Sequence, residues 1–268
     1  MRVKKNLSLQ IGFVLVGSLT LLMLVSLIYT PYDPNQMFPD ERLQRPSMQH
    51  LMGTDNFGRD ILSRVMEGAQ TAFLIGSMSV AIGLSFGLVL GSISGYFGGW
   101  IDELIMRLID AMMALPGILF AIVLVAVFSP SLTITIIAIG LMSIPSFTRI
   151  IRSSFVQAKE FDYVKASKAK GASHVRLMYH HILPNSLSPI IVAITLSFSS
   201  SVLAESGLSY LGLGVQPPFA SWGRMLKEAQ PFIAATPSYI IIVGGVITCM
   251  VLGFNLLSDG IRDANARK

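Results

Sequence analysis

The sequence predicts an all-α membrane protein with six transmembrane helices. Hydrophobic residues make up 52% of the 268 residues and charged residues only 13%, whereas an ordinary soluble domain has roughly a quarter charged residues. The charged residues also gather between long uncharged runs, and a helix of about 20 apolar residues is enough to cross a bilayer. This combination disfavours a soluble enzyme. The uncharged runs cover residues 6–32, 68–101, 111–148, 177–204 and 229–258.

Six predicted spans follow from these five runs. The third run is too long for one crossing, and Ser129-Pro130-Ser131 divides it. An even number of crossings places both termini on the same side of the membrane. The predicted spans cover residues 9–29, 72–96, 104–128, 132–151, 187–208 and 237–257.

We interpret the first span as an uncleaved anchor. The apolar part of a signal peptide is roughly 7–15 residues long and precedes a small-residue cleavage site, whereas this run is longer and ends in Leu27-Ile28-Tyr29-Thr30-Pro31. The following segment is rich in Pro, Asp and Asn, as external loops are. The expected organisation is an anchor helix with an external loop over 1–70, a core of five spans over 71–258 that includes a cytoplasmic loop over 152–186, and a cytoplasmic tail over 259–268.

The positions of Lys and Arg predict the orientation, because cationic segments resist translocation. Thirteen of them lie before the first span, in the loop after the fourth span and in the C-terminal tail. Six lie in the segments 30–70 and 209–236. We therefore place both termini and the long loop in the cytoplasm. The net charge of +5 then reflects membrane topology, and we predict no nucleic-acid partner.

A line of small residues runs along the second span. It consists of Ser79, Gly83, Gly87, Gly91 and Gly95, spaced by four, so these residues share one face of a helix. Small residues let another backbone approach closely in lipid, which predicts a packing seam. The alternative is that glycine is simply common in membrane helices. Whether the partner helix belongs to this chain or to another subunit stays open.

The third and fourth spans carry charges and breaks. Arg107 and Asp110 lie three residues apart, where side chains meet on one helix face, so we expect a pair near the cytoplasmic interface. Pro116-Gly117 and Pro145 interrupt the two spans. Broken helices line substrate paths in many transporters, although kinks without function are as common.

The fifth span is unusual in its hydroxyl groups. Ser197, Ser200 and Ser201 lie close to Glu205, with Ser199 among them. Such a density of hydroxyls can line a polar translocation path, but serines also bond harmlessly to the carbonyl one turn back. Glu205 is either an interfacial carboxylate or a gate contact.

The sequence offers no catalytic or metal-binding set. Cys249 is the only cysteine, and a zinc or iron–sulfur site needs several ligands at set spacings. His174, His180 and His181 share one loop, where an interface or capping role is the simpler interpretation. The chain lacks the G-x-x-x-x-G-K-[ST] loop that binds phosphates. We therefore predict that it binds no cofactor and cannot hydrolyse ATP itself.

The cytoplasmic loop contains a short predicted helix. Residues 164–170 are compatible with a helix, and Gly171 is a typical stop. Small side chains alternate with lysines, which indicates an exposed helix that docks against a partner. The alternative is a basic loop that lies on anionic lipid, but this would not explain the stop at Gly171 or the re-entry at Ile182-Leu183-Pro184.

Three blocks of sequence resemble one family. Residues 162–173 (D-Y-V-K-A-S-K-A-K-G-A-S) with 181–185 (H-I-L-P-N) resemble the cytoplasmic "EAA" loop of binding-protein-dependent ABC importer permeases, E-A-A-x3-G-x9-I-x-L-P. Residues 53–64 (G-T-D-N-F-G-R-D-I-L-S-R) and 208–218 (L-S-Y-L-G-L-G-V-Q-P-P) with Trp222-Gly223 resemble its dipeptide, oligopeptide and nickel branch. The likeness covers nearly the whole chain. Importers of this branch have two permeases, and the short N-terminal tail is similar to that of the second one.

The loop departs from the family pattern at three positions. Lys165 stands where the pattern has glutamate, Ser167 takes the third position of the triplet, and His181 replaces an isoleucine, whereas Ala166 and Gly171 match. The resemblance implies that the loop couples the chain to an ATPase. The implied coupling residues are Val164, Lys165, Ala166, Ser167, Ala169, Gly171, Ile182 and Pro184.

The resemblance also implies a type I ABC importer permease fold with a cytoplasmic coupling helix, in a bacterial or archaeal inner membrane. Its implied partners are a homologous second permease, two ABC ATPases that bind ATP and magnesium, and an extracellular substrate-binding protein. Peptides are the implied cargo, and nickel or a metal chelate is the alternative. A secondary transporter would need ion-coupling residues and usually an internal repeat, and a membrane enzyme would need a convergent catalytic set.

Overall fold

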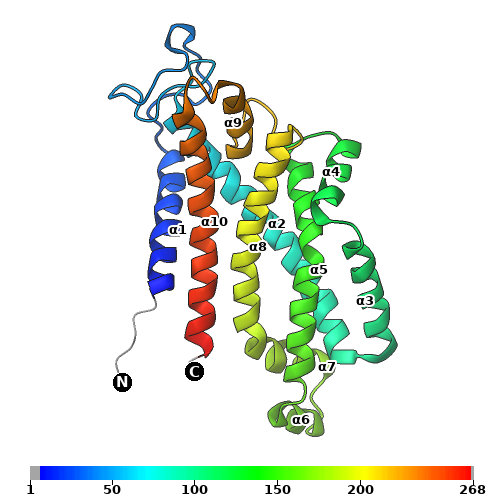
Figure 1. Cartoon of the computed structure of the whole chain (residues 1–268). Coiled ribbons are helices and arrows are strands. Elements are labelled where there is room, and N and C mark those ends of the chain that lie inside the picture. Colours follow the sequence, from blue (N-terminus) through cyan, green and yellow to red (C-terminus); the bar gives the residue numbers. More distant parts are fainter. Residues whose placement is uncertain (1–6, 267–268) are drawn as a thin grey trace.

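The computed structural model describes residues 7–266 and is a bundle of long helices (Figure 1). Within these residues no strand forms, and the single β-bridge joins Thr54 to Asp60. The all-α prediction is confirmed. The cationic residues Arg2, Lys4 and Lys5 and the last two residues of the predicted tail lie outside the described residues.

Within residues 7–266, ten α-helices are joined by short helical turns. They are α1 (Leu7–Ser26), α2 (Ile61–Phe97), α3 (Gly99–Met113), α4 (Gly117–Phe128), α5 (Leu132–Ala158), α6 (Asp162–Ala169), α7 (His174–Arg176), α8 (Leu187–Leu211), α9 (Trp222–Ala229) and α10 (Pro237–Ala266), with the turns η1 (Pro39–Glu41), η2 (Leu177–Ile182), η3 (Leu183–Ser186) and η4 (Gln230–Phe232).

Five segments of the described chain are long and apolar enough to cross a membrane: α1, α2, α5, the continuous rod from α7 to α8, and α10. The predicted third span, 104–128, is not one straight helix. It is divided into α3 and α4, which are bent by 77° to each other, and the described chain has six candidate spans when this pair is counted as one broken span. The cause is Pro116, which has no N–H to donate and disfavours a helical residue before it.

The second span begins earlier than predicted, at Ile61 rather than residue 72. The carboxylate of Asp60 accepts the backbone N–H of Ser63 at 2.8 Å and so caps the first turn. Arg64 lies in this turn and is only 1% exposed. Glu67, three residues further on, ended the uncharged run in the sequence, although the helix continues through both charges.

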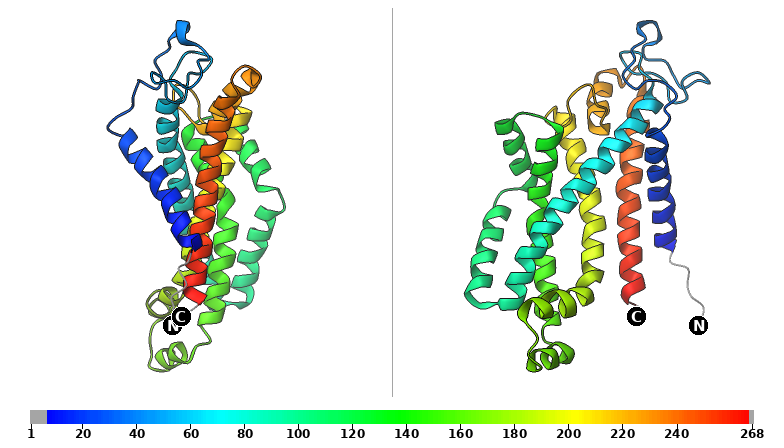
Figure 2. Two further views of the ribbon diagram at one scale, coloured as in Figure 1. Left: turned by 60° about the vertical axis from the view of Figure 1, so that its left-hand side comes forward. Right: turned by 180° about the vertical axis from the view of Figure 1, so that it is seen from behind.

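The helices form one layer of neighbours with α2 lying obliquely across them (Figure 2). α1 lies beside α10, and α8 lies between α10 and α5 (Figure 1). The start of α1 and the end of α10 are at the same end of the bundle as α6, whereas the segment 31–60 and α9 are at the opposite end (Figures 1 and 2). This agrees with an even number of crossings.

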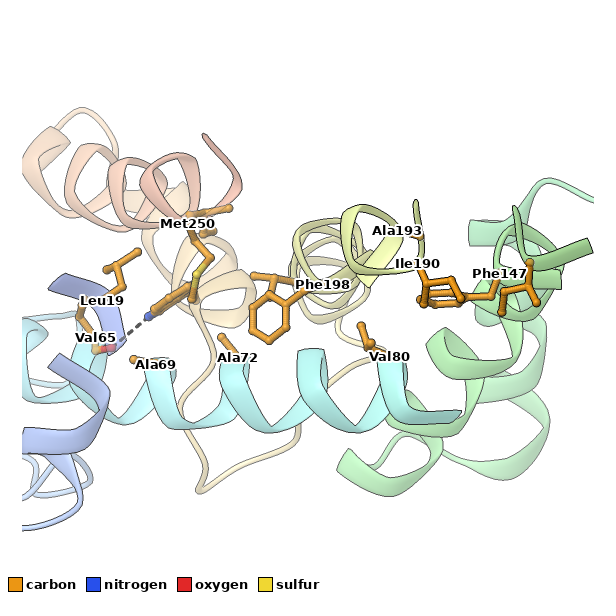
Figure 3. Packing of buried hydrophobic residues seen from close by; sticks show 14 of the residues in the cluster. Leu19, Val65, Ala69, Ala72, Val80, Phe147, Ile190, Ala193, Phe198 and Met250 are labelled. Carbon is orange, nitrogen blue, oxygen red and sulfur yellow. Dashed lines mark hydrogen bonds between the residues drawn. The ribbon is translucent and has the colours of Figure 1, made fainter. Parts of the chain in front are cut away.

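Aromatic side chains fill the contact between α2, α8 and α10 (Figure 3). Phe198 stacks on Phe254 with ring centroids 4.2 Å apart. It also fills the space beside Gly76, where an added Cβ would lie 2.7 Å from the ring. Near the start of α2, the Trp222 indole donates to the backbone oxygen of Val65 at 3.0 Å and so fixes α9 onto α2.

The glycine line of α2 lies against α5 of the same chain. A Cβ added to Gly91 would lie 2.7 Å from the backbone oxygen of Thr148, and one added to Gly95 would lie 2.7 Å from that of Arg152. A Cβ at Gly87 would meet the side chain of Phe147. Backbone therefore touches backbone along this contact, which explains why side chains are absent there.

Arg107 and Asp110 do not pair with each other. Arg107 binds Glu103, one helical turn away, at 2.5 Å, and Asp110 binds Arg149 of α5 at 2.6 Å. The expected pair is therefore wrong, because each side chain finds a better-placed opposite charge one turn away or across the α3–α5 contact.

The end of the bundle that holds α9 is joined by buried ion pairs. Arg59 lies 2.6 Å from both Asp55 and Glu228, and Arg64 faces the same two carboxylates at 3.7 and 3.6 Å. Arg224 also binds Glu228, at 2.9 Å. These pairs link the segment 31–60 to α2 and α9, and we call them the α9 charge network.

Candidate coupling loop and membrane path

The helix α6 begins at Asp162, two residues before the predicted range, and ends before Gly171, as the sequence predicts. The N–H groups of Val164 and Lys165 donate to the oxygen of Phe161 at 3.0 and 3.2 Å. At the other end Gly171 has φ +84°, and its N–H donates to the oxygen of Lys168 at 3.0 Å. An added Cβ at Gly171 would meet no atom within 4 Å. Glycine is therefore required here by the left-handed backbone and not by lack of space.

A small number of contacts hold α6 to the bundle. Val164 is 3% exposed and belongs to the main apolar core. The Tyr163 hydroxyl donates to the backbone oxygen of His181 at 3.3 Å, and partial burial raises the pKa of this phenol, so it stays a neutral donor at physiological pH. Ala166 and Ala169 point to solvent. The helix thus presents a small-residue face on its outer side.

The return limb of the loop is a direct extension of α8. Ser173 caps α7, and the chain continues through the π-helical turn η2 and the 3-10 turn η3 into α8 without a break. Pro184 lacks the N–H that a regular helix would use there, so the backbone leaves the α pattern around it. Ile182 is fully buried against the bundle. A movement of α6 therefore acts directly on α8.

The histidines of the loop make interface contacts, as expected. His174 Nδ1 lies 2.8 Å from the hydroxyl of Tyr96, and the rings of His180 and His181 meet edge to face. Among the described residues, no group of three or more His, Cys, Asp or Glu could hold a metal ion.

The serines of α8 face α5 across a pocket of about 330 Å³. Ser197, Ser200 and Ser201 line it, together with Ser143 and Ser146 of α5. Sequence reasoning missed the two α5 serines, although their positions on either side of Pro145 were visible. The arrangement offers hydroxyl groups from two helices to one space.

A second pocket, of about 200 Å³, lies at the break between α3 and α4. Met112, Met113 and Met142 are among its lining residues, and it shares Met142 and Ser146 with the serine pocket. The two pockets therefore adjoin, one with hydroxyl groups and one with apolar walls.

Glu205 lies apart from this pocket. It is 1% exposed and accepts a hydrogen bond from the Ser209 hydroxyl at 2.6 Å. It is neither an exposed interfacial carboxylate nor part of the serine lining. Its burial near the end of α8 could not be read from the local sequence, because the elements that cover it are distant along the chain.

Comparison with known proteins identifies similar chains. Residues 87–268 match the family described as "Binding-protein-dependent transport system inner membrane component". The chain is 42% identical over 263 residues to the dipeptide transport system permease protein DppC of Alkalihalophilus pseudofirmus, which covers 98% of this chain and 86% of the relative. It is 41% identical over 235 residues to the glutathione transport system permease protein GsiD of Escherichia coli O6:K15:H31, 87% of this chain and 78% of the relative.

Solved structures share the fold. The MetNI methionine ABC transporter in an inward-facing conformation matches with a TM-score of 0.60 and 17% identity, over 78% of this chain and 96% of that chain. An amino acid ABC transporter matches with a TM-score of 0.54 and 20% identity, over 74% and 90%.

Proposed function

The chain belongs to the binding-protein-dependent transport system inner membrane component family, and we propose that it forms half of the translocation path of a peptide importer. Membership makes it a permease subunit of an ABC importer with the type I fold. The dipeptide and glutathione permeases among its relatives support peptides as the cargo. Nickel or a metal chelate stays the alternative.

The observation that carries this proposal is the coupling loop. Its outer face is made of small exposed residues, Ala166 and Ala169, which suits insertion into a cleft of a partner protein. Its return limb continues into α8. We propose that α6 docks on one of two ABC ATPases, which bind ATP and magnesium, and that closure of the ATPase pair moves α6.

The serine pocket is the proposed part of the path. Because α8 carries three of the pocket serines, tilting of α8 by the loop changes the space that these hydroxyls enclose. Hydroxyl groups can both donate to and accept from the amide groups of a peptide. The path thus has two arrangements, and the ATPase pair favours one or the other because it contacts α6 differently in its open and closed states.

The other proposed partners are a homologous second permease, which supplies the other half of the path, and an extracellular substrate-binding protein. The chain is an inner membrane component, and we propose that both termini lie in the cytoplasm. This places α6 on the side where ATP is available.

Uptake by the reconstituted importer tests the proposal. Proteoliposomes that contain this chain with its second permease, ATPases and binding protein should accumulate a labelled dipeptide only when ATP is enclosed on the ATPase side. Accumulation of nickel but not of the dipeptide would show that nickel, and not a peptide, is the cargo. Uptake driven by a proton or sodium gradient without ATP would contradict the proposal.

A further inference from the structure

A basic pocket lies behind the coupling helix. It has a volume of about 360 Å³ and lies between the ends of α2 and α5, the helix α6 and the start of the return limb. Three lysines line it: Lys159 from the end of α5, and Lys165 and Lys168 from α6. Glu160 is also part of the lining.

The charges of this pocket are not balanced. Lys165 pairs with Glu160 at 3.1 Å, which neutralises one lysine. Lys159 donates to the backbone oxygen of Gly95 at 3.0 Å. The carboxylate of Asp102 also attracts Lys159, but this carboxylate is already paired with Arg152 at 2.6 Å. Lys168 has no carboxylate partner among the residues that the structure describes. The pocket therefore carries a surplus of positive charge and favours an anion.

Aromatic side chains place the pocket at the surface of the membrane. Tyr96 and Phe97 line its wall at the end of α2, and Phe97 is 48% exposed. Trp100 follows at the start of α3 and is 74% exposed. Exposed aromatic residues gather at the level of lipid headgroups, and basic pockets at this level bind anionic headgroups.

The pocket and the docking face are on different sides of α6. Val164, Lys165 and Lys168 line the pocket, whereas the exposed residues Ala166 and Ala169 are not part of its lining. A ligand in the pocket therefore leaves the outer face of the helix free for a partner.

We propose that this pocket binds the phosphate group of an anionic phospholipid, such as phosphatidylglycerol, with Lys159 and Lys168 as its cationic ligands. The acyl chains extend along the aromatic side chains at the end of α2. The headgroup then bridges the end of α5 and the coupling helix and holds α6 at a fixed angle to the bundle. This consequence for transport rests on the proposed function, but lipid binding itself does not.

Retention of lipid by the full-length permease, purified with its partner subunits, tests this inference. The probe is phosphatidylglycerol with a fluorescent acyl chain, exchanged into detergent micelles against phosphatidylcholine. Lys168→Gln should weaken binding of phosphatidylglycerol about fivefold, the contribution of one lysine beside an anionic surface. Lys170→Gln is the matched control, because Lys170 is exposed at the end of the same helix and does not line the pocket, and it should bind normally.

Two further arms separate the alternatives. Lys168→Arg should retain binding, which excludes a folding defect as the cause of the loss. If Lys168→Gln and Lys170→Gln weakened phosphatidylglycerol binding equally, there would be no specific site, and the lipid would be held by a diffuse attraction to the basic surface. Displacement of the probe by millimolar inorganic phosphate would overturn the proposal that the ligand is a lipid, and would show that the pocket binds a soluble anion. Normal lipid binding by an importer that fails to transport dipeptides would count against the proposed function alone.

Discussion

The two polar ends of this bundle are built in opposite ways. At the end that holds α9, Arg59 and Arg64 are buried and face carboxylates from two segments distant in the sequence. At the other end α6 exposes its lysines, and its one ion pair joins Lys165 and Glu160, whose side chains are 58% and 65% exposed. The end that holds α9 pairs its buried charges within the chain, whereas α6 leaves Lys168 without a carboxylate partner among the described residues.

This difference shows where each end obtains its stability. A buried charge network holds together only if every member is present, because removal of one partner leaves an uncompensated buried charge. An exposed pair contributes little, so α6 depends on Val164 and the return limb for its position. The end that holds α9 is thus suited to act as a fixed frame, and the end that holds α6 is suited to respond to a partner.

The largest expected effect concerns the sides of the membrane. Single cysteines at Met48, which is 96% exposed, and at Lys170 should react with an impermeant thiol reagent from opposite sides in a Cys249→Ser background. Labelling of intact cells and of inverted vesicles checks this. If the Lys170→Cys protein reacted in intact cells, α6 would lie outside the cell and could not dock on a cytoplasmic ATPase.

Arg64→Ala should destabilise the end that holds α9 by about 3–5 kcal/mol, because it leaves buried carboxylates without their cation. The free energy of unfolding in mixed micelles measures the loss. Arg45→Ala is the control, since Arg45 is exposed in the segment 31–60 at the same end of the bundle and should change stability by less than about 0.5 kcal/mol. Equal losses would show that the network does not hold this end together.

Ala166→Asp should weaken ATPase binding by about 2–5 kcal/mol, because it places an unpaired carboxylate in the proposed interface. The folded permease should stay at normal abundance, since Ala166 is exposed in the isolated chain. Co-purification of the ATPase and dipeptide uptake report the effect. Full uptake would exclude the outer face of α6 as the docking surface.

Gly91→Leu tests the α2–α5 contact that connects the two ends. The added side chain would displace the backbone around Thr148, and overpacking of this kind costs about 1–3 kcal/mol. Val89→Leu is the control on the same helix, because Val89 is 48% exposed. A similar loss of stability in both variants would argue against a packing seam.

Lys165→Glu should have the smallest effect. It restores the usual residue of the family loop and loses only an exposed pair, worth about 0–1 kcal/mol. We expect ATPase co-purification to fall by less than about fivefold. A larger loss would mean that the partner ATPase carries acidic residues that match this lysine, and that Lys165 belongs to the docking surface.

Local patterns in the sequence determined the spans, the line of glycines and the coupling helix. Hydropathy over about 20 residues predicts a crossing whatever its neighbours are. The stop at Gly171 was likewise visible, because it depends on the left-handed backbone of one residue. Pro116 indicated where the third span is interrupted, although not that α3 and α4 bend by 77°. The expected interruption of the fourth span at Pro145 is wrong, because α5 continues through this proline.

Only the tertiary structure decided which distant residues meet. It brought Arg59 to Glu228, 169 positions away, and Arg149 to Asp110, and it placed α5 on the glycine line of α2. It also buried Glu205 away from the serines with which the sequence grouped it. The physical reason is that hydropathy and helical period act within a segment, whereas the burial and pairing of a charge depend on every element packed around it.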